Sequence, residues 1–209
     1  VIGYADMLRS RKLDEEKHFL SANYIYTEGK RLEAMSLRLL DIIVTRRYHL
    51  EPQDTEVESL FAYLEEIYAE KKEIRVVFQY EPGRIQVEAN LLKSVLLNLT
   101  DNACKASEAG GMVEVFGRNE EDGYCFAVKD YGTGISPEEC RKITEAFYMV
   151  DKSRSRSHNG AGLGLALCVE ILKLHGSELV IESTPGVGSC FHFQIPGKGT
   201  DSRETKGET

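Results

Sequence analysis

Three glycines at alternate positions, Gly160, Gly162 and Gly164, run directly into an apolar, helix-favouring segment that begins at Leu163. Glycine lets consecutive peptide N–H groups point into one concavity, and the start of the following helix adds a partial positive charge, so such a stretch favours phosphate binding. The same glycines would equally permit a tight turn from loop to helix with close packing. The stretch therefore predicts a loop-to-helix junction, and the rest of the chain decides whether that junction holds phosphate.

The first 48 residues have the pattern of two helices, a short one ending near Arg11 and a long one ending near Tyr48. Apolar residues of the long helix follow the alternating three-and-four spacing of a heptad seam, at Ile25, Leu32, Met35, Leu39 and Ile42. A seam of this length favours a second copy of the chain as its partner, and the alternative is packing on the chain's own domain. We therefore expect residues 1–51 to form a helical hairpin that dimerises and is ended by Pro52.

From Asp54 onward, helix and strand patterns alternate. We expect helices over 56–71, 90–109, 137–146 and 163–175, and strands over 74–80, 85–87, 112–118, 124–129, 178–182 and 189–195. Asp54 is expected to cap the first helix, Ser136 is expected to begin the third, and the strands 74–80 and 85–87 are interpreted as a hairpin. This order predicts an α+β fold, a two-layer α/β sandwich over 52–197 in which helices cover one face of a mixed sheet, followed by a disordered tail over 198–209.

Composition argues against several classes of protein. The chain has 26 Lys and Arg against 34 Asp and Glu, a formal charge of −8, so we expect no nucleic-acid partner and no membrane contact. Five widely spaced cysteines without a Cys-x-x-Cys pair indicate free thiols in a reducing compartment. No apolar run is long enough to cross a bilayer, and the start lacks a signal-peptide pattern, so we expect the cytoplasmic part of a longer protein.

The helix predicted over 90–109 carries Asn98, Asn102 and Lys105 near one face, because residues three and four positions apart are neighbours on a helix. Amide oxygens can coordinate a hard cation such as Mg²⁺, which shares phosphate oxygens, and a lysine can meet the same phosphates. The alternative is a polar, solvated helix face. The leucines between these residues indicate that much of the helix is buried, so its polar groups should need partners.

Asp130 stands at the end of a predicted strand, immediately before Gly132 and Gly134. A carboxylate can accept a hydrogen bond from an exocyclic amine, and glycines let a planar base approach the backbone. Alone, an Asp-x-Gly-x-Gly sequence is more often a turn than a binding site. Together with the asparagine helix before it and the glycine loop after it, it could complete a site for metal, base and phosphates.

Four motifs in this order resemble the N, G1, F and G2 boxes of sensor histidine kinases. They are Asn-Leu-Thr-Asp-Asn-Ala-Cys-Lys at 98–105, Asp-Tyr-Gly-Thr-Gly at 130–134, Phe-Tyr-Met-Val-Asp-Lys-Ser-Arg at 147–154 and Gly-Ala-Gly-Leu-Gly at 160–164. These kinases share an ATP-binding α/β sandwich, the Bergerat-type ATPase fold, with gyrase. The resemblance covers about Glu56 to Pro196, and it implies an enzyme that uses ATP and Mg²⁺ to phosphorylate a histidine.

The resemblance also implies a role for each matching residue. Asn102 resembles the Mg²⁺ ligand, Asn98 the residue that helps place metal-bound water and phosphate, and Lys105 a phosphate contact. Asn98 and Lys105 are therefore the catalytic residues expected within the chain, and Asp130 resembles the aspartate that recognises the adenine amine. Further nucleotide contacts are expected at Gly132, Gly134, Ile135, Tyr148, Lys152, Arg154, Gly160, Ala161, Gly162, Leu163 and Gly164.

The segment from about Ile135 to Leu163 resembles the mobile ATP lid of this family, and its lack of periodicity agrees with that interpretation. Two positions depart from the family pattern. Ala106 stands where an aromatic residue is common, and Thr144 stands where the first phenylalanine of the F box is usual. We expect these departures to alter the stability of the lid and to leave ATP binding intact.

The helical pair at 1–48 is similar to the dimerisation and phosphoacceptor hairpin of the family. None of the five histidines has the Glu and Pro neighbours of the acceptor box, so the acceptor is expected before Val1. The family implies a response-regulator receiver domain as the partner that takes the phosphoryl group onto an aspartate. A nucleotide-binding dimeric module without transfer activity and a serine kinase of the anti-sigma-factor type remain open, whereas a Rossmann site is disfavoured because polar residues precede Gly160.

Overall fold

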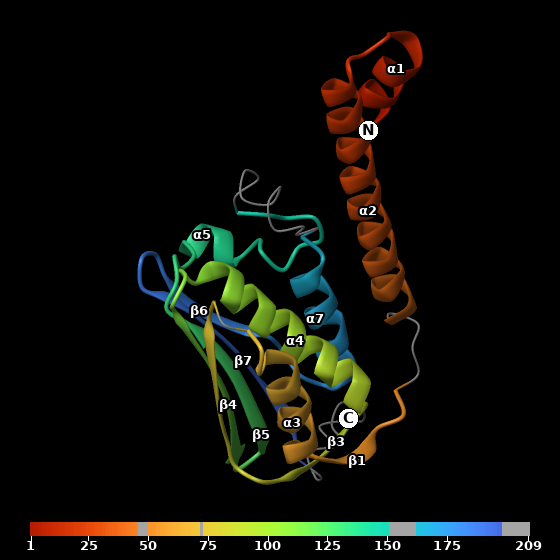
Figure 1. Ribbon diagram of the computed structural model, residues 1–209. Helices are drawn as coiled ribbons and strands as arrows, with labels where there is room; N and C mark the ends of the chain where they lie inside the picture. The colour runs from red at the N-terminus through yellow and green to blue at the C-terminus, as the bar shows by residue number, and fades with distance from the viewer. Residues whose placement is uncertain (46–49, 72, 151–161, 198–209) are drawn as a thin grey trace.

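The computed structural model describes residues 1–45, 50–71, 73–150 and 162–197. Figure 1 shows a pair of helices that extends from an α/β sandwich, with the N-terminus on the helical pair. The tail expected over 198–209 lies outside the described residues. Within the described part, no helix is both long and apolar enough to span a membrane.

The helical pair consists of α1 (Ile2–Ser10) and α2 (Glu15–Thr45). The ring of Tyr4 on α1 lies 4.4 Å from that of Tyr24 on α2, centroid to centroid, which holds the short helix against the long one. The later part of α2 packs against α7 (Gly164–Leu174) of the sandwich, and Ile42 is only 6% exposed there. The end of the predicted seam therefore packs within the chain, whereas Leu32 remains 55% exposed.

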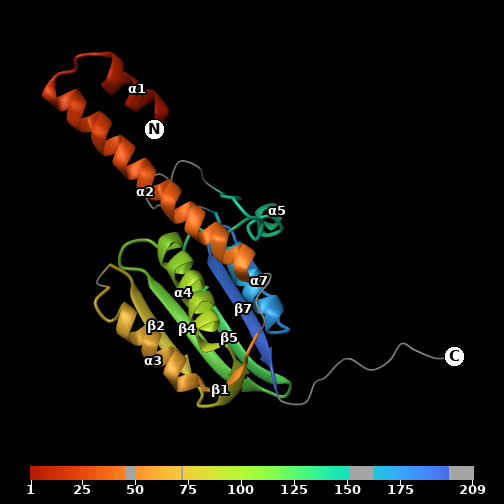
Figure 2. The same cartoon turned by 90° about the vertical axis from the view of Figure 1, so that its right-hand side faces the viewer.

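A five-stranded sheet forms one layer of the sandwich, in the order β2 (Arg75–Tyr80), β4 (Met112–Glu120), β5 (Gly123–Asp130), β7 (Gly188–Pro196) and β6 (Val180–Thr184). β2 pairs with β4 in parallel, and the other neighbours are antiparallel. The second layer contains α3 (Val57–Tyr68), α4 (Ala89–Ala106) and α7, all on the same face of the sheet (Figure 2). The predicted mixed sheet with helices on one face is confirmed.

The core lies between these two layers. Its fully buried side chains come from the inward faces of α3, α4 and α7 and from alternate residues of β4, β5 and β7: Leu60, Phe61, Leu64, Leu92, Leu96, Leu99, Ile171, Leu172, Val113, Val115, Phe126, Val128 and Phe193. Each large apolar side chain buried in this way contributes about 1.5–3 kcal/mol of transfer free energy. The core therefore fixes which face of α4 is turned toward the sheet.

The interpretation of 74–80 and 85–87 as a hairpin is wrong. β2 pairs with β4, so that Val76 lies opposite Val113 and Phe78 opposite Val115. β3 (Arg84–Val87) instead pairs antiparallel with β1 (Gln53–Glu56), a strand that was not predicted. β2 is a partly buried edge strand whose apolar residues pack against α3, and the nine-residue β4 offers all six of its residues a partner, whereas β3 has only four residues.

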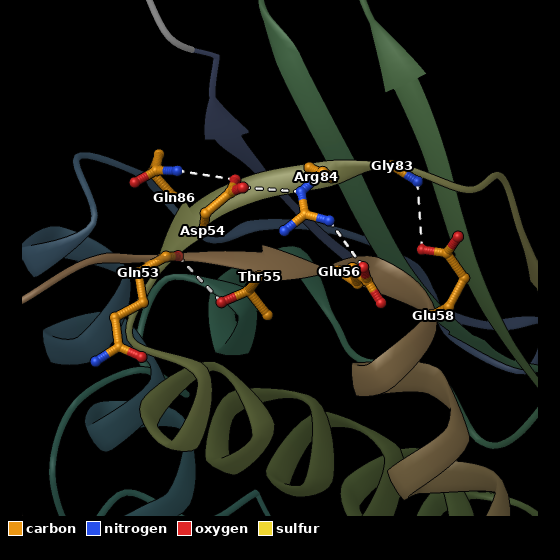
Figure 3. A network of polar contacts seen from close by, with 8 residues as sticks. All are labelled: Gln53, Asp54, Thr55, Glu56, Glu58, Gly83, Arg84 and Gln86. Atoms are coloured by element: carbon orange, nitrogen blue, oxygen red, sulfur yellow. Dashed lines mark hydrogen bonds and ion pairs between the residues drawn. The ribbon is translucent and has the colours of Figure 1, made fainter.

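The expected helix cap at Asp54 is also wrong, because this residue belongs to β1 (Figure 3). Its carboxylate accepts hydrogen bonds from Arg84 Nε at 2.8 Å and from Gln86 Nε2 at 3.0 Å, both on β3. Arg84 Nη1 also donates to Glu56 Oε1 at 2.7 Å. Arg84 thus bonds both carboxylates of β1 across the strand pair. The helix α3 begins after this strand, at Val57.

Two predicted helix signals are confirmed and one helix is shorter than expected. Ser136 and Glu139 form a capping box at the start of α5 (Pro137–Cys140), with Pro137 in its first turn, but the helix ends at Cys140 and does not reach residue 146. The helix predicted over 163–175 ends where expected, with Leu174 as its last residue, His175 as its C-cap and Gly176, with φ of +66°, directly after it. All five cysteines are free thiols, which agrees with the prediction.

Candidate functional site

Helix α4 places the two asparagines of the first motif. Glu88 is the N-cap of this helix, and its carboxylate accepts hydrogen bonds from the backbone N–H groups of Asn90 and Leu91. Asn98 and Asn102 are half-buried beside the face that packs on the core. The Nδ2 group of Asn98 donates to the carbonyl oxygen of Ser94 at 2.9 Å, so its Oδ1 atom is left to accept.

Asn102 makes no hydrogen bond through its side chain within the part of the chain that the structure describes. Its neighbour Asp101 accepts hydrogen bonds from Tyr68 Oη at 2.9 Å and Lys71 Nζ at 3.1 Å. Burial alone would raise the pKa of Asp101, but the bonds from Lys71 and Tyr68 outweigh burial and lower that pKa. Asp101 therefore links α4 to the C-terminal end of α3, and the positive charge of the exposed Lys105 also acts on its carboxylate.

A metal ion at this helix would have to rely on amide oxygens. Among the described residues, no group of three His, Cys, Asp or Glu side chains is placed to hold a metal ion. The Oδ1 atoms of Asn98 and Asn102 are hard oxygen donors one helical turn apart, and Mg²⁺ uses few protein ligands when phosphate oxygens and water complete its shell. The two asparagines therefore fit a Mg²⁺ ion that is bound together with a nucleotide.

Strand β5 carries Asp130 at its end, where the carboxylate is only 2% exposed. The backbone N–H of Gly132 donates to Asp130 Oδ1 at 2.9 Å. Burial raises the pKa of Asp130, and the Gly132 N–H together with the N–H and hydroxyl groups of Ser189 offset part of that rise. Because the Gly132 N–H occupies only one lone pair of Oδ1, the Asp130 carboxylate can still accept a hydrogen bond from a ligand.

The loop after Asp130 is fastened to the end of α4. A Cβ atom on Gly132 would lie 2.1 Å from the carbonyl oxygen of Ala106, so only glycine allows this approach. The N–H of Thr133 donates to the same carbonyl at 3.3 Å. On its other side, Gly134 has φ of +63° and packs on the backbone of Thr184 in β6. The asparagine helix and the aspartate strand are thereby joined at one point.

Phe147 of the F motif is also in contact with Gly162 of the last glycine motif. The N–H of Phe147 donates to the carbonyl oxygen of Gly162 at 2.8 Å, and both residues have positive φ, +68° and +66°. A left-handed phenylalanine costs about 1–2 kcal/mol, so the surrounding contacts must hold it. Tyr148 is half-buried against the core, Leu163 is fully buried, and Gly164 begins α7.

Four expected nucleotide contacts, Lys152, Arg154, Gly160 and Ala161, lie outside the described residues. Figure 1 shows the C-terminal end of α4, the N-terminal end of α7 and α5 at the same end of the sandwich. α4 and α7 are direct packing partners. Ile135 lies beside β6, where its N–H donates to Ser183 Oγ at 2.8 Å. The motifs that are far apart in sequence thus converge on one end of the molecule.

Sequence reasoning did not find two hydroxyl groups at this end, those of Ser183 and Ser189. Both lie on the hairpin formed by β6 and β7, and Ser189 is the register partner of Asp130. The available signal was Gly188 immediately before Ser189, since a glycine at the start of a strand often marks a close backbone approach. Which strand that glycine would approach is decided by sheet order, and local sequence does not encode it.

The fold and the site define a class of protein, the α/β-sandwich ATPases with a mixed sheet covered by helices on one face. The chain belongs to the family described as "Histidine kinase-, DNA gyrase B-, and HSP90-like ATPase", whose model matches residues 87–199. This match includes α4, the loop after β5 and the start of α7.

Similar proteins place the chain among the sensor histidine kinases and confirm that resemblance. It is 32% identical over 200 residues to the alginate biosynthesis sensor protein KinB of Pseudomonas aeruginosa, covering 91% of this chain and 33% of that protein. It is 29% identical over 190 residues to the sensor protein SrrB of Staphylococcus aureus strain N315, covering 88% of this chain and 32% of that protein. The chain thus spans about a third of the length of these relatives.

Solved structures agree with the fold. Full-length ShkA in complex with AMPPNP matches with a TM-score of 0.71 and 26% identity, over 94% of this chain and 42% of that chain. The catalytic domain of the histidine kinase ThkA matches with a TM-score of 0.59 and 26% identity, over 69% of this chain and 95% of that one. The first match spans the helical pair as well as the sandwich, and the second corresponds in extent to the sandwich.

Proposed function

We propose that this chain is the core of an ATP-dependent histidine protein kinase, which transfers the γ-phosphoryl group of ATP to a histidine for relay to a response regulator. The observation that carries the proposal is the junction of Asp130, Gly132 and the end of α4, because it brings a base-recognising carboxylate beside the asparagine helix. Family membership gives the arrangement its chemical meaning.

In this proposal Asp130 accepts a hydrogen bond from the exocyclic amine of adenine, through the acceptor capacity left by Gly132. Gly132 and Gly134 keep the adjacent backbone close enough for a planar base to lie against it. Ile135 and Tyr148 are proposed to line the nucleotide site, with Lys152 and Arg154 as further contacts. Asp130 must be ionised for this role, because the O–H of a protonated carboxyl group and the N–H of the adenine amine are both hydrogen-bond donors.

The phosphates are proposed to lie between α4 and the start of α7. Lys105 would neutralise phosphate charge, and the N–H groups from Gly160 to Gly164 would bind phosphate oxygens at a helix N-terminus. Asn98 and Asn102 would hold Mg²⁺ directly or through water, and the bound ion would offset the negative charge that develops on the transferred group. The protein's own contribution is positioning, because no covalent enzyme intermediate is needed.

The remaining assignments concern organisation and partners. We propose residues 1–51 as the dimerisation hairpin and 52–197 as the ATP-binding unit. Exposed apolar side chains along α2, including Phe19 at 69% and Leu40 at 54%, support a second copy of the chain as the partner of the helical pair. A receiver domain as the next phosphoryl acceptor and a cytoplasmic location follow from the family resemblance and are proposed on that basis.

The test combines binding with transfer. The chain is titrated with ATP in the presence of Mg²⁺, and it is then incubated with γ-labelled ATP and a separately supplied helical hairpin that carries an acceptor histidine. An acid-labile phosphoprotein supports the proposal. Acid-stable labelling would identify a serine kinase, and ATP binding with no labelling would identify a nucleotide-binding module. Gln79→Ala, an exposed site on β2, serves as the matched control.

A further inference from the structure

Ser183, on β6, lies at the centre of a hydrogen-bond cluster that the four sequence motifs do not include. Its Oγ atom accepts the N–H of Ile135 at 2.8 Å. The same oxygen lies 2.9 Å from Ser189 Oγ and 3.0 Å from the carbonyl oxygen of Gly188. One half-buried hydroxyl therefore contacts both the loop after β5 and the start of β7.

Ser189 extends this cluster to the carboxylate. It is 5% exposed and is the register partner of Asp130 across the β5–β7 pair. Because directly opposed residues of an antiparallel pair place their side chains on the same face, the Ser189 hydroxyl lies beside the Asp130 side chain, and the N–H and hydroxyl groups of Ser189 lower the pKa of that carboxyl group. A path of hydrogen bonds thus runs from the N–H of Ile135 through the Ser183 hydroxyl to the Ser189 hydroxyl, which lies opposite the side chain that faces the proposed base.

The number of protons restricts how this path can be arranged. Each serine hydroxyl has one hydrogen to donate and two lone pairs to accept with. If Ser183 donates to Ser189, then Ser189 can donate its own hydrogen to Asp130, and every donor in the path points toward the carboxylate. If Ser183 instead donates to Gly188, Ser189 receives no hydrogen from it. The negative charge of Asp130 favours the first arrangement, because hydrogen bonds to a charged acceptor are the stronger ones.

We propose that Ser183 is a positioning residue for base recognition. By accepting from Ile135 and donating to Ser189, it holds the Asp130 carboxylate and the 131–135 loop in the arrangement that selects an adenine amine. The inference rests on the proposed function, since it takes Asp130 as the contact to the base.

The loop has other attachments, so removing the Ser183 hydroxyl should leave the fold intact. The N–H of Gly186 donates to the carbonyl oxygen of Thr133 at 2.8 Å, and the N–H of Thr133 donates to that of Ala106 at 3.3 Å. Both bonds are backbone to backbone and do not depend on Ser183. We therefore expect that removing the Ser183 hydroxyl lowers the selectivity for adenine and leaves the chain folded.

The experiment measures the dissociation constants of ATP and of inosine triphosphate, which has a carbonyl where adenine has its amine. Ser183→Ala is expected to weaken ATP binding about three- to tenfold, the effect of one hydrogen bond, with little change for inosine triphosphate. Ser183→Thr retains the hydroxyl and should restore the parent ratio of the two constants. Thr184→Ala, at the exposed neighbouring position, is the matched control and should leave the ratio unchanged.

Two results would overturn the inference about Ser183. One is an unchanged ratio in Ser183→Ala, and the other is an equal weakening of both nucleotides, which would indicate a purely structural role. If Asp130→Asn removes the selectivity of the parent while Ser183→Ala preserves it, only the inference about Ser183 fails. If the parent binds neither nucleotide, or shows no selectivity between them, the proposed function fails together with it.

Discussion

Replacing Gly132 by alanine places a methyl group where the structure has no room for one. The new Cβ would lie 2.1 Å from the carbonyl oxygen of Ala106 and 2.5 Å from its carbonyl carbon. The two backbone segments must separate by about 1 Å to restore ordinary contact, and overpacking of this kind costs about 1–3 kcal/mol. The shift also weakens the bond from the Gly132 N–H to the buried Asp130 carboxylate, and a bond to a charged group contributes about 1.5–3 kcal/mol.

Because one displacement causes both losses, they are not additive, and we expect the free energy of unfolding to fall by about 2–4 kcal/mol. Urea unfolding followed by far-ultraviolet circular dichroism measures this change, and calorimetry should show ATP affinity reduced more than about tenfold. Gly110→Ala is the matched control, since Gly110 has φ of +81° but nothing within 4 Å of an added Cβ. It should lose about 1–2 kcal/mol and keep its ATP affinity. Parent stability and parent affinity in Gly132→Ala would refute the packing argument.

Three further perturbations test individual residues. Asn102→Ala should reduce ATP affinity in Mg²⁺ to its value in a chelator, with little effect on stability; a persistent Mg²⁺ dependence would remove the metal assignment. Because burial raises the pKa of Asp130, ATP affinity should begin to fall on acidification at a higher pH than for an ordinary aspartate, and calorimetry of Asp130→Asn should show lower affinity without that acid limb. The buried ring of His175 accepts the N–H of Glu88 at Nε2 (3.1 Å), and burial lowers its pKa below the ordinary 6.5. The unfolded chain then binds the proton first, so the free energy of unfolding should decrease as pH falls below about 6.5; an equal slope in His175→Asn would contradict this.

Much of the fold was predictable because its signals are local. Apolar spacing identified α4 and α7, and the capping box at Ser136 and the glycine at 176 located helix ends correctly. The site motifs were predictable for a related reason. Asn98 and Asn102 share a helix side through their spacing alone, and the glycines beside Asp130 indicate a close backbone approach before any partner is known.

The errors in strand pairing concern partners distant in sequence. β3 has a turn before it that suits a hairpin with β2, yet β2 pairs with β4 and leaves β3 to a strand that contains Asp54. The end of the seam on α2 packs within the chain at Ile42, one of the two alternatives that its spacing left open. In each case several partners satisfied the local pattern, and packing of the whole core selected one.

The sequence by itself determined the chemistry of the molecule: a carboxylate, two amides, a lysine and two glycine-rich motifs in an order shared with one family of ATPases. Only the tertiary structure decided how these groups meet. It placed the Ala106 carbonyl against Gly132, it brought Ser189 opposite Asp130 through the β5–β7 pairing, and it placed the Ser183 hydroxyl against that of Ser189. The physical reason is that residue type and spacing act over one or two helical turns or along one strand, whereas sheet order and register result from burying a single core.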